Sequence, residues 1–223
     1  MTVERELMNA ADVVMEAPEP VENLSQFEMA IRRFDEENAR DPNTAIIGGE
    51  SIPYELFYAQ RLTEWVLRLC PAASEALLLA ARCQHLCRWM IPRASYEMTR
   101  PGYLTWRADL KQFHARKSAE ILAEVGYPRT VIDRVRSLNL KRDLGRDREV
   151  QVLEDALCLV TLQHQLGDLM RKAEREKMIT IVQKTWKKMS PAAREAALEL
   201  SYSDDERALI AAALSSSGEG LKR

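Results

Sequence analysis

The chain has 223 residues, of which 46% are hydrophobic and 30% are charged, a composition typical of a globular protein rather than a disordered one. Its 32 basic and 34 acidic residues give a net charge of −2, which argues against a general binder of nucleic acid. With only 8 glycines and no glycine-rich phosphate motif, any phosphate would have to be held by side chains rather than by a backbone loop.

Apolar residues at helical spacing, punctuated by proline and glycine, predict about nine helices. They are expected at residues 25–39, 51–69, 73–90, 104–125, 130–138, 146–166, 168–188, 192–200 and 204–214. The segment 45–50 carries Gly48 and Gly49 and is predicted as a loop. No segment alternates polar and apolar residues for long enough to predict a strand. The sequence therefore predicts an all-α fold.

The two ends of the chain lack this periodicity. Residues 1–22 are acidic and predict a flexible tail, residues 23–214 predict one compact helical domain, and residues 215–223 predict a polar C-terminal tail. No apolar run reaches the roughly 20 residues that a membrane helix needs, and no signal peptide is visible. The four cysteines are interpreted as reduced thiols, so we expect a cytoplasmic protein with no membrane partner.

Charge is distributed unevenly along the chain, because residues 1–52 are mainly acidic and residues 82–117 are mainly basic. The basic segment also contains His85 and His114. Arginine presents a planar fork that suits phosphate or carboxylate, so this segment predicts a pocket for a small anionic metabolite, phosphorylated in our interpretation. The alternative is a solvated basic face that pairs with the acidic N-terminal segment. The predicted ligand-binding residues of the segment are Arg82, Arg88, Arg93, Tyr103, Trp106 and Arg107.

The order of residues from Tyr54 to Gln165 resembles the HD-domain superfamily of metal-dependent phosphohydrolases. The resemblance rests on His85 near the end of an apolar helix, His114 in the next long helix and Asp155 in a later one. It implies a single HD-like helical domain in which these three residues are the catalytic residues and the metal ligands. Such a donor set suits one divalent transition metal: zinc, iron or manganese.

The same resemblance places other residue types where the family usually has ligands. Tyr58 and Lys141 occupy two such positions, and Gln84 stands where the histidine of a His-Asp pair is expected. A lysine beside a dication is unfavourable unless a substrate anion lies between them. The resemblance therefore implies an altered metal centre, and it adds these three residues to the predicted ligand-binding set.

A longer stretch, from Phe27 to Ser190, resembles an uncharacterised domain-of-unknown-function family of bacteria, fungi and plants. The matching strings include Gln84-His85-Leu86-Cys87-Arg88-Trp89 and Gly102-Tyr103-Leu104-Thr105-Trp106-Arg107. This resemblance implies no particular reaction, because the family has no established activity.

The sequence is consistent with two kinds of function. The first is the binding of a small anionic ligand in the Arg and His pocket, with metal-assisted phosphoester hydrolysis as the reaction if the protein is an enzyme. The alternative is a non-catalytic helical interaction or regulatory protein without a metal, for which the basic segment around Trp186 is a candidate surface. A homo-oligomer is compatible with either function.

Overall fold

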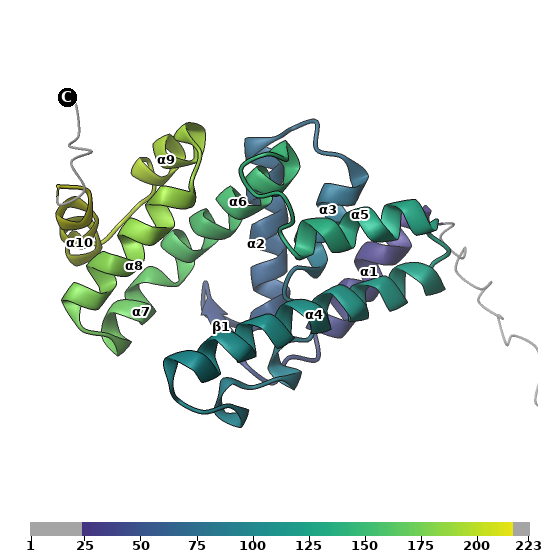
Figure 1. Cartoon of the computed structure of the whole chain (residues 1–223), viewed down its shortest axis with the longest axis horizontal. Helices are drawn as coiled ribbons and strands as arrows, with labels where there is room; N and C mark the ends of the chain where they lie inside the picture. Colours follow the sequence, from purple (N-terminus) through teal and green to yellow (C-terminus); the bar gives the residue numbers. More distant parts are fainter. Residues whose placement is uncertain (1–23, 216–223) are drawn as a thin grey trace, which may run out of the picture.

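The computed structural model describes residues 24–215, so the predicted tails lie outside it except for Ser215. Within this part the chain forms ten α-helices, two short 3-10 helices and one β-hairpin (Figure 1). In chain order these are α1 (Gln26–Asn38), β1 (Thr44–Ile47), β2 (Glu50–Pro53), α2 (Tyr54–Leu69), α3 (Glu75–Cys83), the 3-10 helices Arg88–Met90 and Arg93–Ser95, α4 (Arg100–Glu124), α5 (Arg129–Asn139), α6 (Arg148–His164), α7 (Leu166–Lys172), α8 (Arg175–Lys188), α9 (Pro191–Leu198) and α10 (Asp204–Ser215). The all-α prediction is confirmed, and an HD-like arrangement stays a prediction.

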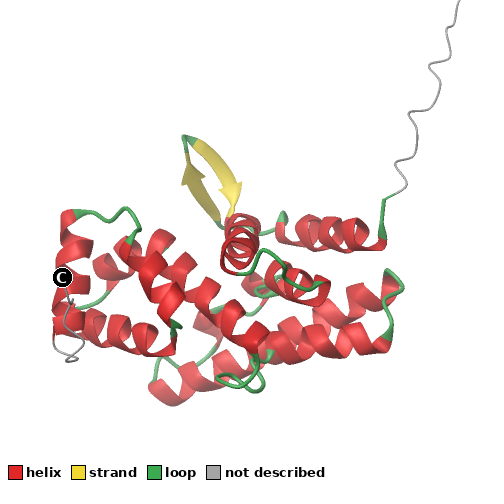
Figure 2. Cartoon of the chain, turned by 90° about the horizontal axis from the view of Figure 1, so that it is seen from above, coloured by secondary structure: helices red, strands yellow, loops and turns green. Residues whose placement is uncertain are grey.

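The prediction of a plain loop at residues 45–50 is wrong, because this segment belongs to the hairpin of β1 and β2. The two strands pair antiparallel, with Ala45 opposite Ile52, and the hairpin projects from the helical body (Figure 2). The turn uses Gly48 and Gly49 at φ +60° and +90°, which glycine adopts without strain. Each strand has only four residues, which is too short for a period-two pattern to be recognised.

Hydrogen bonds to the first backbone N–H groups explain why two helices begin at other residues than predicted. Helix α2 begins at Tyr54 because Asp41 Oδ2, from the preceding loop, accepts the backbone N–H of Glu55 at 3.0 Å. Helix α4 begins four residues earlier than predicted, since Thr99 caps the N–H of Gly102 through its hydroxyl. Residues 168–188, predicted as one helix, are divided between α7 and α8.

The predicted helix 73–90 also ends early, at Cys83, and this change shapes the site. Beyond it the chain turns through Cys87, which has a left-handed φ of +54° and whose N–H donates to Asn38 Oδ1. The next residues form the 3-10 helix that begins at Arg88. The left-handed Cys87 redirects the backbone after it, so Arg88 does not continue the face of α3.

Helix α6 is the central element of the fold (Figure 1). It packs against α2, α8 and α9, while α3 packs against α1, α2 and α5, and α4 packs against α5 and α1. One apolar core runs through these helices, and its fully buried side chains include Phe34, Leu62, Leu77 and Leu159. Among the described helices, none is both long enough and apolar enough to cross a bilayer.

Candidate functional site: a basic pocket beside α6

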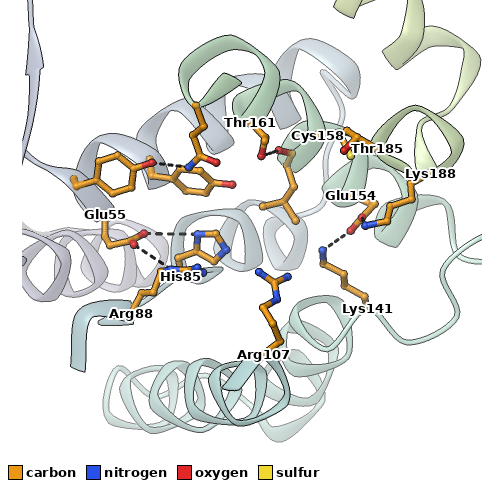
Figure 3. A pocket seen from close by; sticks show the side chains of 14 residues that line it. Glu55, His85, Arg88, Arg107, Lys141, Glu154, Cys158, Thr161, Thr185 and Lys188 are labelled. Carbon is orange, nitrogen blue, oxygen red and sulfur yellow. Dashed lines mark hydrogen bonds and ion pairs between the residues drawn. The ribbon is translucent and has the colours of Figure 1, made fainter. Parts of the chain in front are cut away.

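The candidate site is a cavity of about 280 Å³ where α2, α4, α6 and α8 meet, and the turns that follow α3 and α5 contribute to its lining (Figure 3). Several residues predicted as ligand-binding or catalytic line it together: Tyr58, His85, Arg88, Arg107 and Lys141. Its size is at the lower end of small-molecule sites, which suits a small metabolite.

One end of the cavity is cationic. Lys141 and Lys188 both bind Glu154, the second at 3.3 Å from Oε1, and Arg107 points its guanidinium into the space beside them (Figure 3). Within residues 24–215, Arg107 has no ion pair and no side-chain hydrogen bond. Three cations therefore face one carboxylate, and a positive charge remains that no side chain there neutralises.

The pKa values of neighbouring groups reflect this excess of positive charge. Burial alone would raise the pKa of Glu154, but the charges and hydrogen bonds of Lys141 and Lys188 lower it below its usual range. Lys111, one helical turn beyond Arg107 on α4, has a lowered pKa because of burial and of repulsion from Lys141 and Arg107. The cationic end therefore carries a field that favours an anion.

The opposite end contains a buried acid and a buried histidine. Glu55 is 4% exposed, and its oxygens lie 3.6 Å from His85 Nδ1 and 3.7 Å from Arg88 Nε. Burial, reinforced by the charge of Asp41, raises the pKa of Glu55 to about 8 even though Arg88 opposes the shift. Burial and the charge of Arg88 hold the pKa of His85 well below its usual value. Both shifts favour the neutral forms of these side chains.

Two aromatic rings fix the positions of His85 and Arg88. The His85 ring stacks on Tyr58 with centroids 4.6 Å apart, and the Arg88 guanidinium lies over Trp106 at 5.0 Å from the ring centroid. Trp106 in turn donates from Nε1 to the carbonyl of Ile91 at 2.9 Å. Trp106, predicted as a ligand-binding residue, is therefore a support for Arg88 rather than part of the cavity lining.

Four other predicted ligand-binding residues are not in the lining. Arg93 donates to the carbonyls of Tyr96, Glu97 and Thr99 and so holds the loop before α4. Tyr103 lies at an adjoining groove that shares Arg107 with the site, and Gln84 is buried with Oε1 unpaired. Arg82 binds both carboxylate oxygens of Asp35 at 2.7 and 2.8 Å, so it joins α3 to α1.

This pairing predicts a structural effect of Arg82. We expect Arg82→Ala to lower the free energy of unfolding by about 1.5 kcal/mol, because a bidentate, largely buried pair is lost and Asp35 remains. Arg32→Ala removes an exposed pair on α1 and should change the free energy by less than about 0.5 kcal/mol. Urea denaturation measures both, and equal midpoints for the two variants would contradict the structural role.

The three residues predicted as metal ligands do not come together. The rings of His85 and His114 lie 5.9 Å apart, and His114 Nδ1 donates to the carbonyl of Leu86. Asp155 Oδ1 accepts from Gln151 Nε2 and from the backbone N–H of Ser190, each at 2.9 Å, and Asp155 does not line the cavity. Within residues 24–215, no group of three or more His, Cys, Asp or Glu side chains could hold a metal ion. The donor set does not fit the predicted metal, so we derive no reaction step through one.

A family model described as a domain of unknown function, DUF4202, matches residues 28–210. The chain belongs to this family. All residues that line the cavity lie within the matched part of the DUF4202 chain. No curated protein and no solved structure matches it.

Several lining residues of this DUF4202 protein were not identified from its sequence. On α2 they are Tyr54 and Glu55, and on α6 and beyond they are Glu154, Leu157, Cys158, Thr161, Gln165, Thr185 and Lys188. Positions 154, 158, 161 and 165 recur at helical spacing, so they form one stripe of α6. This stripe of a carboxylate, a thiol, a hydroxyl and an amide is the signal that could have located the site.

Proposed function

We propose that this DUF4202 protein binds a small phosphorylated anion in the basic pocket. The observation that carries the proposal is the unpaired guanidinium of Arg107, which points into the cavity next to Lys141 and Lys188. These three cations and Glu154 leave a formal charge of +2, which matches a phosphate group with its charge of about −1.5 to −2 at pH 7.

The roles of the cationic groups follow from their shapes. The planar fork of Arg107 can contact two phosphate oxygens at once, whereas the two lysines act as point charges. Glu154 holds both lysine ammonium groups at the cavity, because its buried carboxylate binds them simultaneously. The lysines therefore need not be ordered by the ligand, which reduces the entropic cost of binding.

The proposal concerns recognition and names no reaction. For the alternative, a helical interaction or regulatory protein, the candidate surface around Trp186 keeps its exposed lysines, but the Trp186 ring is only 7% exposed and belongs to the core. A regulatory protein that responds to the bound anion is compatible with the same pocket. A cytoplasmic location and an HD-like arrangement are part of the proposal on the sequence grounds given above.

Inorganic phosphate tests this proposal. At about ten times its Kd, phosphate should raise the stability of the protein by about 1.4 kcal/mol, seen as a higher Tm than in sodium chloride of equal ionic strength. Arg107→Ala should abolish the increase, because the unpaired guanidinium is lost. Arg116→Ala is the matched control, since Arg116 lies on the same helix and is 69% exposed. An equal increase in both variants, or none in the wild type, would overturn the proposal.

A further inference from the structure

The two ends of the pocket differ in chemistry, and this difference constrains the ligand beyond its phosphate. Resting on the proposed function, we propose that the ligand is a phosphorylated polyhydroxyl compound, a sugar or polyol phosphate, whose hydroxyl groups bind at Glu55. The cationic end takes the phosphate, and the end formed by α2 and the C-terminal part of α6 takes the hydroxyls (Figure 3).

The first support is a buried polar atom that lacks a partner. Glu55 is one of the residues that line the cavity, and its Oε2 is buried and makes no hydrogen bond. Buried polar groups are almost always hydrogen-bonded, since an unsatisfied one costs about 1–3 kcal/mol. A ligand hydroxyl at this point would supply the missing partner.

Further hydroxyl and amide groups lie around Glu55. Gln165 Nε2 donates to the hydroxyl of Tyr54, while Tyr58 and Thr161 line the same part of the cavity. Hydroxyl groups both donate and accept, so a cluster of them can satisfy several ligand hydroxyls at once. A neutral, protonated Glu55 adds a donor as well as an acceptor.

The surroundings of Glu55 disfavour a charged group at this end. An ammonium group would be repelled by Arg88, whose Nε lies 3.7 Å from Glu55, and a second anion would be drawn to the cationic end instead. A neutral hydroxyl is neither repelled by Arg88 nor drawn away to the cationic end, so it can bind beside Glu55.

A nucleobase also fits this end poorly. The only aliphatic side chain in the lining is Leu157, and the Tyr58 ring is already stacked on His85. The cavity of about 280 Å³ leaves little room for a base beside a sugar phosphate. These features favour a compact polyhydroxyl group over a nucleoside.

Calorimetric titration of ribose 5-phosphate and inorganic phosphate, as separate probes, tests the inference. In the wild type, ribose 5-phosphate should bind at least about 10-fold more tightly than inorganic phosphate, the value of one well-made hydrogen bond to a buried group. Glu55→Met removes the acceptor at similar volume and should bring this ratio close to one. Glu64→Met, on the same helix but outside the cavity lining, should keep the wild-type ratio. Tyr54→Phe, which removes a single hydroxyl, should lower the ratio even if Glu55→Met does not fold.

The outcomes separate this inference from the proposed function. A wild-type ratio near one, with phosphate still bound, overturns the inference and leaves the phosphate site. The inference is also overturned if both Glu55→Met and Tyr54→Phe keep the wild-type ratio of ribose 5-phosphate affinity to phosphate affinity. Tighter binding of adenosine monophosphate than of ribose 5-phosphate would overturn it as well. Failure of both probes to bind overturns the proposed function itself.

Discussion

Asp155→Ala is expected to lower the free energy of unfolding by about 3 kcal/mol. The Asp155 side chain is buried, and its Oδ1 accepts from Gln151 Nε2 and from the backbone N–H of Ser190. Hydrogen bonds to a charged group contribute about 1.5–3 kcal/mol each, and their loss leaves the N–H of Ser190 unsatisfied at the start of α9. Gln151 also donates to the carbonyl of Lys188, so this network connects α6 to the end of α8 at the pocket.

Urea denaturation with and without a chelator distinguishes this structural role from metal binding. We expect Asp155→Ala to lose stability whether or not EDTA is present, and we expect EDTA to leave the wild type unchanged. Asp133→Ala, at an exposed position on α5, should change stability by less than about 0.5 kcal/mol. A wild type that EDTA destabilises to the level of Asp155→Ala would show that Asp155 is a metal ligand after all.

The second large effect is a pH dependence caused by Glu55. An unfolded glutamate titrates near 4.5, whereas burial raises the pKa of Glu55 in the folded protein to about 8. Between these values the folded state binds one more proton than the unfolded state, so stability falls as the pH rises. The full loss is on the order of 5 kcal/mol, and its slope is about 1.4 kcal/mol per pH unit.

Comparison of the wild type with Glu55→Gln between pH 6.5 and 8 isolates this effect. Burial lowers the pKa values of His85 and His164 and brings that of His114 to about 4, so each histidine adds stability as the pH rises through its unfolded pKa near 6.5. This gain occurs in both proteins and cancels in their difference. The raised pKa values of Cys83, Cys87 and Cys158 affect stability only near and above pH 9.

Urea denaturation across this interval, at constant ionic strength, checks the prediction. Between pH 6.5 and 8, the wild type and Glu64→Gln should lose about 1.6 kcal/mol relative to Glu55→Gln, whose side chain cannot ionise. Parallel curves for Glu55→Gln and the wild type would show that Glu55 is ionised in the folded protein.

The fold class was predictable because helical periodicity is a local property of the sequence. Proline and glycine positions placed most helices to within a few residues, and the DUF4202 match covers the same region. The hairpin was missed because its strands are short, and the end of α3 was missed because the left-handed turn at Cys87 has no glycine to signal it.

The site was predictable only in part, since its composition depends on which helices meet. Arg82 was predicted as a ligand-binding residue, but its partner Asp35 lies 47 residues away, and the sequence cannot place the two side by side. Neighbours on a helix point about 100° apart, so Glu154 and Asp155 cannot both face one site. The packing of α6 decides that Glu154, rather than Asp155, lines the cavity. Lys188 enters the cavity from α8, which no local pattern could predict.

Calorimetric titration of inorganic phosphate into the wild type and Arg107→Ala tests the phosphate site directly. We expect one phosphate bound per chain in the wild type and at least about a 10-fold loss of affinity in Arg107→Ala, because the charged hydrogen bonds of the guanidinium are lost. Equal affinities in the two proteins, or no binding to the wild type at millimolar phosphate, would contradict this expectation.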